Sequence, residues 1–208
     1  MTDDLLVPVF DLGGVMFDWN PLYLYRKIFE TEEEARWFLE TVCTSDWNLG
    51  LDAGNSFAES VAHLTARFPR YWREIAAFDT RWREMTAGLI EGTMAIHDEL
   101  IAAELPTFAI TNFSWEKWIS VVPDFPFLEK FDGIVVSGLE RLVKPDPRIF
   151  HVFCDRYALA PESCVFIDDN EINVASARGV GMQALHFTSP DQLRKDLIGL
   201  GMPLKAKV

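Results

Sequence analysis

The sequence lacks the features that would place it in a membrane or outside the cell. No apolar run approaches the roughly 20 residues that a membrane-spanning helix needs. Its three cysteines are scattered and odd in number, without metal-ligand spacing, so we expect reduced, buried thiols in a cytoplasmic protein. The first four residues, Met1 to Asp4, include two aspartates and no basic residue, which predicts no signal peptide.

Basic residues are also scarce relative to acidic ones. The chain has 19 Lys and Arg against 32 Asp and Glu, a formal net charge of -13. Nucleic acids need a basic stripe along their phosphates, and anionic membranes attract basic clusters, so we expect neither as a partner. An acidic surface does not exclude a phosphorylated substrate, because its capture depends on the local field of the pocket.

Short apolar runs that end in polar residues are the main pattern present. In the second half of the chain they alternate with helical patterns, which is typical of a parallel, doubly wound α/β sheet with a Rossmann-like core. The expected strands are residues 7–11, 106–111, 133–137, 163–168 and 183–187.

A block of different character interrupts this pattern after the first strand. Apolar residues recur at helical spacing, as at Leu22, Tyr25 and Phe29, which predicts a small α-helical bundle of three or four helices. We therefore expect an α/β core made of residues 1–19 and 84–208, with residues 20–83 inserted into it.

Four polar segments fall at or near the ends of the expected strands: Asp11, Thr111-Asn112, Lys144 and Asp168-Asp169. The carboxyl ends of parallel strands meet at the edge where open α/β sheets bind ligands. Taken singly, each segment is commonly a turn, a helix cap or a solvated loop. Their occurrence together on one edge predicts a single functional site.

The residue types in this set suit the chemistry of a phosphate ester. The Asp11 carboxylate can attack phosphorus and form an aspartyl-phosphate. Asp11 and the pair Asp168-Asp169 would repel one another without a cation, and Mg²⁺ prefers such oxygen ligands. Lys144 can neutralise the nucleophile and the phosphate, while Thr111-Asn112 can donate hydrogen bonds to the phosphate oxygens. The expected partner is a small phosphorylated substrate.

These segments resemble the four motifs of the haloacid dehalogenase-like superfamily, whose members are mostly phosphatases. The matching segments are Phe10–Val15, Ile110–Asn112, Val143–Phe150 and Phe166–Asn170. The insertion resembles the helical cap of the branch acting on small soluble substrates, and the first motif is closest to bacterial members resembling glucose-1-phosphate phosphatases. The resemblance implies a Mg²⁺-dependent phosphomonoester hydrolase, with a sugar phosphate as one candidate substrate.

The sequence departs from that family pattern at Gly13. Most phosphatases of the family carry there a second Asp, two residues after the nucleophile, which acts as general acid and base. The backbone carbonyl of Gly13 can still bind Mg²⁺, but proton transfer to the leaving group needs another carboxylate. Asp18, expected in the loop to the cap, and Asp52, expected in a cap loop, are the candidates.

Two other functions remain open. The first is a metal-free 2-haloacid dehalogenase; such members resemble one another in a Tyr at the position of Gly13 and neutral residues in place of Asp168-Asp169. The second is a phosphate-binding or partner-binding module that has lost catalysis. Most aromatic residues of the insertion are expected in its core. Trp47 and Asp52 are expected to face the substrate from a break between helices, and Trp19 to line the entrance.

Overall fold

A parallel β-sheet forms the centre of the protein in a computed structural model that describes residues 6–205. In spatial order the strands are β5 (Gly133–Val136), β4 (Phe108–Thr111), β1 (Val7–Phe10), β6 (Cys164–Asp168) and β7 (Gln183–His186). All four pairings are parallel. The chain runs outward from β1 to one side of the sheet and then to the other, so the predicted doubly wound fold class is confirmed.

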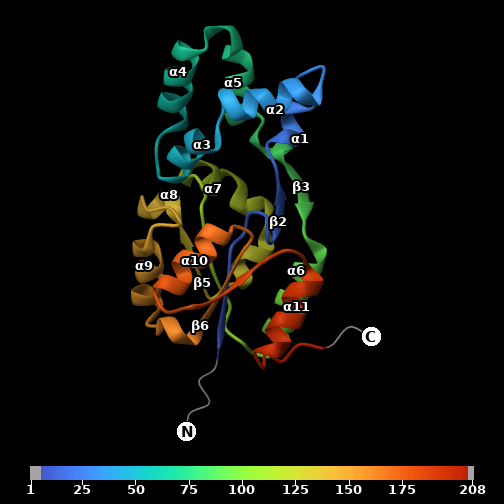
Figure 1. Ribbon diagram of the computed structural model, residues 1–208, viewed down its shortest axis with the longest axis vertical. Helices are drawn as coiled ribbons and strands as arrows, with labels where there is room; N and C mark the ends of the chain where they lie inside the picture. Colours follow the sequence, from blue (N-terminus) through green and yellow to red (C-terminus); the bar gives the residue numbers. More distant parts are fainter. Residues whose placement is uncertain (1–5, 206–208) are drawn as a thin grey trace.

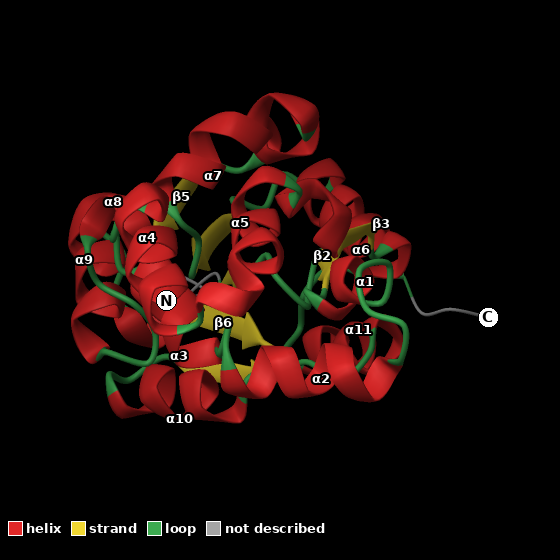
Figure 2. Cartoon of the chain, turned by 90° about the horizontal axis from the view of Figure 1, so that it is seen from above, coloured by secondary structure: helices red, strands yellow, loops and turns green. Residues whose placement is uncertain are grey.

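Helices cover both faces of this sheet (Figure 2). They are α6 (Glu91–Ala102), α9 (Pro147–Tyr157), α10 (Glu171–Gly179) and α11 (Pro190–Gly199). Side chains of β1 alternate between two hydrophobic clusters: Phe10 packs with residues of α6 and α11, and Val9 with residues of α9 and α10. Both faces of β1 are therefore buried, which explains its continuous apolar sequence.

A group of helices lies above the sheet in Figure 1 and forms the inserted helical cap. It consists of α1 (Leu22–Tyr25), α2 (Glu32–Thr41), α3 (Ser45–Asp52), α4 (Phe57–Arg67) and α5 (Trp72–Thr80). These helices enclose a hydrophobic cluster of their own around Tyr25, Phe38 and Phe78. The division of the chain into core and cap at residues 20 and 83 stays a prediction. The separate hydrophobic cluster of the cap supports it.

Two short strands that the sequence analysis did not predict connect the cap to the core. β2 (Phe17–Trp19) pairs antiparallel with β3 (Thr86–Leu89), so the outgoing and returning chains lie side by side (Figure 1). The expectation of a loop at Asp18 was therefore wrong: Asp18 lies in β2 and accepts a hydrogen bond of 2.8 Å from the Tyr23 hydroxyl. Strands this short show no periodicity, and their pairing joins residues far apart in sequence.

The expected helix break around residue 50 was also misplaced, because Trp47 and Asp52 both lie within α3. The Thr44 side chain caps this helix by accepting a hydrogen bond from the Trp47 N–H, which offsets the low helix propensity of Gly50. Trp47 packs edge-on against Phe78 in the cap core, with ring centroids 5.0 Å apart. Trp47 is partly buried against the cap core and does not line the pocket beside the carboxylate cluster, so the expectation that it faces the substrate was wrong.

The remaining elements are short. They are α7 (Trp115–Val121), α8 (Ser137–Glu140) and the 3₁₀ helices Pro69–Tyr71, Trp82–Met85, Val122–Asp124, Pro126–Lys130 and Pro161–Ser163. Within residues 6–205 no helix is long and apolar enough to cross a membrane. The acidic stretch Met1 to Asp4, on which the signal-peptide prediction rests, lies outside the described residues.

Candidate active site

The register of the central strands brings the predicted acidic residues together. Phe10 of β1 pairs with Ile167 of β6, so the next residues, Asp11 and Asp168, leave adjacent strands at the carboxyl edge of the sheet. Asp169 follows directly. One carboxylate oxygen from each of the three aspartates lies within 4.8 Å of the others.

Lys144 lies against this carboxylate cluster and is itself almost completely buried, with 1% of its surface exposed. Its Nζ is 2.9 Å from Asp11 Oδ1 and 2.7 Å from Asp168 Oδ2. Burial alone would lower the pKa of Lys144, but the Asp11 and Asp168 carboxylates outweigh that effect, so its pKa is raised. The lysine therefore stays a cation at neutral pH.

Asn112 holds the backbone of Lys144 in place. Its Nδ2 donates to the Lys144 carbonyl at 3.0 Å, and the Lys144 N–H donates to Asn112 Oδ1 at 2.8 Å. Both ends of the Asn112 amide are thus bonded to the loop that carries the lysine. The predicted contact of Asn112 with phosphate stays a prediction; the contacts present show a positioning role.

The surroundings of Asp11 disfavour the charged form of its side chain. Burial raises its pKa to about 7; the Lys144 cation opposes this shift, whereas the nearby Asp168 and Asp169 carboxylates add to it. When all three carboxylates are ionised, the single ammonium group leaves two negative charges without a partner in the cluster. A divalent cation would balance them.

Asp168 is fixed by contacts that the sequence analysis missed. Asn173 Nδ2 lies 3.1 Å from both Asp168 oxygens, and the Asn170 N–H donates to Asp168 Oδ1 at 2.8 Å. Asn173 is nearly buried on the first turn of α10. These contacts hold the Asp168 carboxylate in a fixed orientation, as contacts behind a metal ligand do. An Asn five residues after a strand-end Asp was the available signal.

Two further features fit a cation and a phosphate group. The Thr111 hydroxyl is buried and has no hydrogen-bond partner within the described part of the chain, so it can donate to a phosphate oxygen. Gly14 has φ +73°, and a Cβ there would collide with the Asp169 carboxylate. The absence of a side chain at Gly14 therefore lets the first loop approach the acidic cluster closely.

Gly14→Ala is accordingly expected to weaken Mg²⁺ binding by at least about tenfold, because the new methyl group displaces Asp169. Calorimetric titration of Mg²⁺ would measure the effect, with circular dichroism as a check of folding. Gly201→Ala is the matched control, because Gly201 has φ +83° and no atom lies within 4 Å of a Cβ there. Equal Mg²⁺ affinity in Gly14→Ala and wild type would contradict the assignment of Asp169 to the cation.

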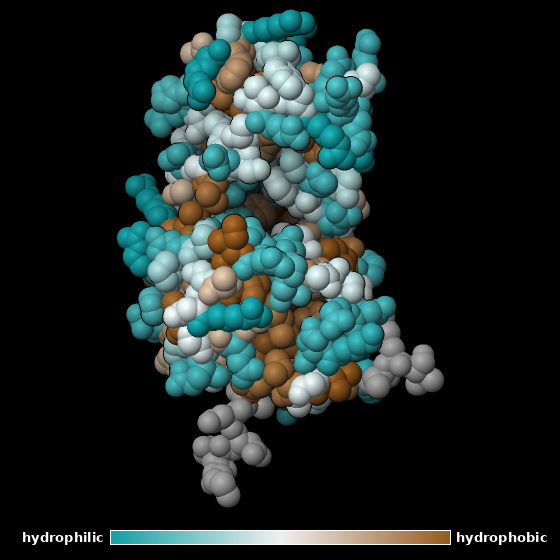
Figure 3. Space-filling model, in the orientation of Figure 1, coloured by the Kyte–Doolittle hydropathy of each residue, from teal (hydrophilic) through white to brown (hydrophobic). Residues whose placement is uncertain are grey.

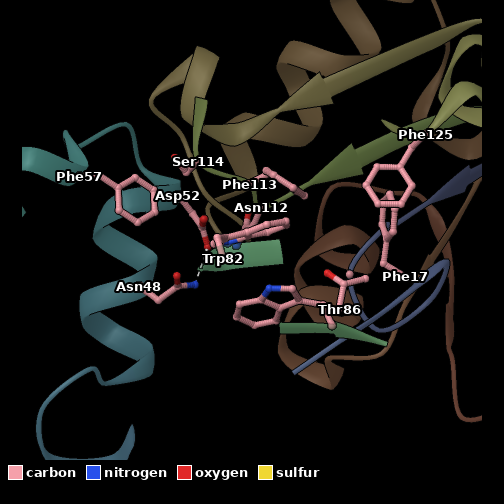
Figure 4. Close-up of a pocket in the computed structure, with 12 residues that line it drawn as sticks. Phe17, Asn48, Asp52, Phe57, Trp82, Thr86, Asn112, Phe113, Ser114 and Phe125 are labelled. Carbon is pink, nitrogen blue, oxygen red and sulfur yellow. Dashed lines mark hydrogen bonds between the residues drawn. The ribbon is translucent and has the colours of Figure 1, made fainter. Parts of the chain in front are cut away.

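A pocket opens beside the carboxylate cluster, between the sheet edge and the cap. The space-filling view shows a hollow there (Figure 3), and Figure 4 shows its walls. Its apolar lining residues are Phe17, Trp19, Phe57, Trp82, Phe113 and Phe125. Its other lining residues are Gly13, Asn48, Asp52, Thr86, Asn112 and Ser114. Trp19 therefore lines the pocket, as expected, although from strand β2 and not from a loop.

Asp52 is the ionisable side chain of this lining, and it enters from the end of α3. Asn48 Nδ2 donates to Asp52 Oδ2 at 3.1 Å (Figure 4). Burial raises the pKa of Asp52 to about 7, opposed by a hydrogen bond from the Ser114 backbone and by the Lys144 charge. Asp18, the other candidate, does not line the pocket.

The fold and the site thus define an α/β protein with a Rossmann-like core, an inserted helical cap and a carboxylate cluster at the strand ends. A model of the haloacid dehalogenase-like hydrolases matches residues 9–181, and the chain belongs to this family. It is 28% identical to a sesquiterpene phosphatase of Aspergillus oryzae, covering 86% of this chain and 88% of that protein. It is 30% identical to a flavin mononucleotide hydrolase of Arabidopsis thaliana, covering 54% of this chain but 46% of that protein.

Solved structures share the fold at low sequence identity. A haloacid dehalogenase-like enzyme of Bacteroides thetaiotaomicron, in complex with magnesium and inorganic phosphate, has a TM-score of 0.66 at 21% identity and covers 89% of this chain and 95% of its own. The L-2-haloacid dehalogenase of Xanthobacter autotrophicus has a TM-score of 0.62 at 15% identity, and the match covers 96% of this chain and 85% of that protein. The fold alone therefore does not separate phosphatase from dehalogenase chemistry.

Proposed function

We propose that this hydrolase is a Mg²⁺-dependent phosphomonoester hydrolase that acts on a small phosphorylated metabolite through an aspartyl-phosphate. The observation that carries the proposal is the cluster of three carboxylates around one buried lysine, with its two unbalanced negative charges. A metal-free dehalogenase would bind no cation to balance that excess negative charge. The unpartnered Thr111 hydroxyl beside the cluster supports phosphate as the group bound there.

In this proposal Asp11, Asp168, Asp169 and the Gly13 carbonyl hold Mg²⁺, which supplies charge neutralisation for the phosphate. The free Asp11 oxygen attacks phosphorus, the bond to the alcohol oxygen breaks, and water later hydrolyses the acyl phosphate. Lys144 stabilises the negative charge that develops on the phosphate oxygens. Thr111 donates a hydrogen bond to the same oxygens.

We propose Asp52 as the group that exchanges a proton with the leaving alcohol in place of the missing aspartate at position 13. It lines the same pocket as Gly13, and its surroundings favour the neutral acid more than those of an exposed carboxyl. A proton donor matters most for alcohols that leave poorly as anions.

Asp52→Asn is therefore expected to slow hydrolysis of alkyl phosphates on the order of 10²-fold or more, while 4-nitrophenyl phosphate is affected little. Asp46→Asn, an exposed residue of the same helix, is the control. Gly13→Asp should restore alkyl phosphate turnover in the Asp52→Asn background, because no atom lies within 4 Å of a Cβ at Gly13. An equal loss on both ester classes would show that Asp52 does not transfer this proton.

The function itself is tested by incubating the protein with Mg²⁺ and either 4-nitrophenyl phosphate or 2-chloropropionate. We expect phosphate release that needs Mg²⁺ and no chloride release. Chloride release that survives chelation would support the dehalogenase instead. Phosphate binding without turnover of any ester would support a binding module.

The compartment and partners belong to the same proposal. The three cysteines are free and buried in the structure, which supports a reducing, cytoplasmic setting. The net charge of -13 supports the absence of nucleic-acid and membrane partners. Relatives are named for a sesquiterpene phosphate, flavin mononucleotide and N-acylneuraminate 9-phosphate, so relatedness leaves the alcohol part of the substrate open. The finer resemblance to glucose-1-phosphate phosphatases also stays a prediction.

A further inference from the structure

The wall of the pocket is mostly aromatic where it leaves the carboxylate cluster. Six of its twelve lining residues are Phe or Trp, and they come from the core, the connecting strands and the cap alike. Figure 4 shows Phe17 beside Phe125 on one side and Trp82 and Thr86 on another. The part of a substrate that extends from the phosphate would therefore meet rings on several sides.

These rings are held by one another. Phe17 and Phe125 meet edge to face with centroids 4.6 Å apart, and Trp82 lies 5.2 Å from Phe113. Such ring-to-ring contacts orient the aromatic side chains without hydrogen bonds. The aromatic lining, formed by Phe17, Trp19, Phe57, Trp82, Phe113 and Phe125, therefore includes residues of both cap and core. It offers dispersion contacts and apolar burial to a molecule bound in the pocket.

Four polar side chains of the pocket already have partners within the protein, whereas the buried Nε1 of Trp19 has none in the described part of the chain. The Asn48 amide donates to Asp52. The Asn112 amide is bonded at both ends to the Lys144 backbone, and the Ser114 hydroxyl accepts from the Lys117 N–H. Apart from the Trp19 N–H, few groups remain to replace the water that the hydroxyls of a sugar would lose on entering the pocket. Unpaired buried hydroxyls weaken binding.

The charge of the pocket restricts the substrate further. No Lys or Arg is among its lining residues, and its one ionisable side chain is Asp52. The nearby Lys117 is paired with Asp79, and its Nζ lies over the Phe57 ring. A second anionic group on the substrate would meet an acidic residue and no unpaired cation.

We propose that the substrate is the phosphate monoester of an apolar alcohol, with the phosphate as its only anionic group. This inference rests on the proposed function and departs from the sugar phosphate that the first motif suggested. The alcohol is recognised by burial among the rings of Phe17, Trp82, Phe113 and Phe125, next to the site where phosphorus is attacked.

A series of n-alkyl monophosphates from ethyl to octyl tests the proposal with the Mg²⁺-loaded protein. Their leaving groups differ little in acidity, so the series isolates the apolar contact. We expect kcat/KM to rise about fourfold per added methylene until the pocket is filled, which corresponds to the free energy of burying one methylene.

Other esters test the character of the alcohol group. Glucose 1-phosphate should be turned over more slowly than hexyl phosphate. Farnesyl monophosphate and 2-(1-naphthyl)ethyl phosphate, both esters of primary alcohols, distinguish a chain from a ring as the apolar group. Farnesyl diphosphate should be a poor substrate.

Trp82→Ala should flatten the series, because it removes one wall of the pocket. Trp72→Ala, an exposed tryptophan of the cap outside the pocket, is the matched control and should leave the slope unchanged. A flat series in the wild type, or a preference for glucose 1-phosphate, would overturn the inference while leaving the phosphatase function intact.

Binding of octylphosphonate and methylphosphonate, measured by calorimetry, gives a second readout that needs no turnover. Tighter binding of octylphosphonate supports the apolar pocket even if every ester resists hydrolysis, in which case the proposed function alone fails. Equal binding of the two phosphonates would overturn the apolar pocket whatever the catalytic result.

Discussion

Asp11→Asn is expected to lower kcat for phosphate release on the order of 10⁴-fold or more, because a neutral amide cannot attack phosphorus. The fold should persist. Asn is close to Asp in size and shape, and burial, which raises the pKa of the Asp11 carboxyl to about 7, disfavours the charge that the substitution removes. Lys144 also keeps its 2.7 Å contact with Asp168 in this variant.

Acid-quenched incubation with a phosphate-labelled ester, followed by recovery of protein-bound label, measures the intermediate directly. Wild type should carry the label and Asp11→Asn none. Asp18→Asn serves as the control, because Asp18 lies in β2 outside the pocket and bonds Tyr23. Retention of a tenth of the wild-type kcat by a correctly folded Asp11→Asn would rule out the aspartyl-phosphate mechanism.

Removal of Mg²⁺ is expected to abolish phosphate release, and readdition to restore it. Without the cation, the two excess negative charges of the cluster remain unbalanced and repel the phosphate. Ca²⁺ should inhibit, since its longer and more flexible coordination misplaces the nucleophile and the phosphate. Activity that survives exhaustive chelation would contradict the metal site.

The variants Asp169→Asn and Asp168→Asn separate the role in metal binding from the role in folding. Asp169 is exposed, so its replacement should raise the Mg²⁺ concentration needed for half-maximal activity with little effect on stability. Asp168 is fully buried and pairs with Lys144, so its replacement should also lower the free energy of unfolding by about 3 kcal/mol. Asp155→Asn, on the exposed face of α9, is the control for both measurements.

The position of the candidate site was predictable from local sequence. Asp11, Thr111 and Asp168 each end an apolar run, and parallel strands must place their carboxyl ends at one edge. The alternation of strands and helices therefore implied that these side chains meet. In the structure, carboxylate oxygens of Asp11, Asp168 and Asp169 lie within 4.8 Å of one another.

The contacts that support the site were not predictable in the same way. Asn173 and Gly14 act through their positions relative to Asp168 and Asp169, which depend on how the helix and loop pack. The ribbon β2–β3 depends on a pairing between chain segments on either side of the cap. No local pattern encodes such long-range contacts.

The sequence by itself determined the fold class, the family and the set of polar groups at the sheet edge, because hydrophobic periodicity and strand ends are local properties. Only the tertiary structure decided which groups form the pocket. Phe17 and Phe125 line one end of it, and Phe57 of the cap lines the other, although these residues come from segments widely separated along the chain. The character of a pocket depends on which side chains converge, and convergence is set by packing between distant segments.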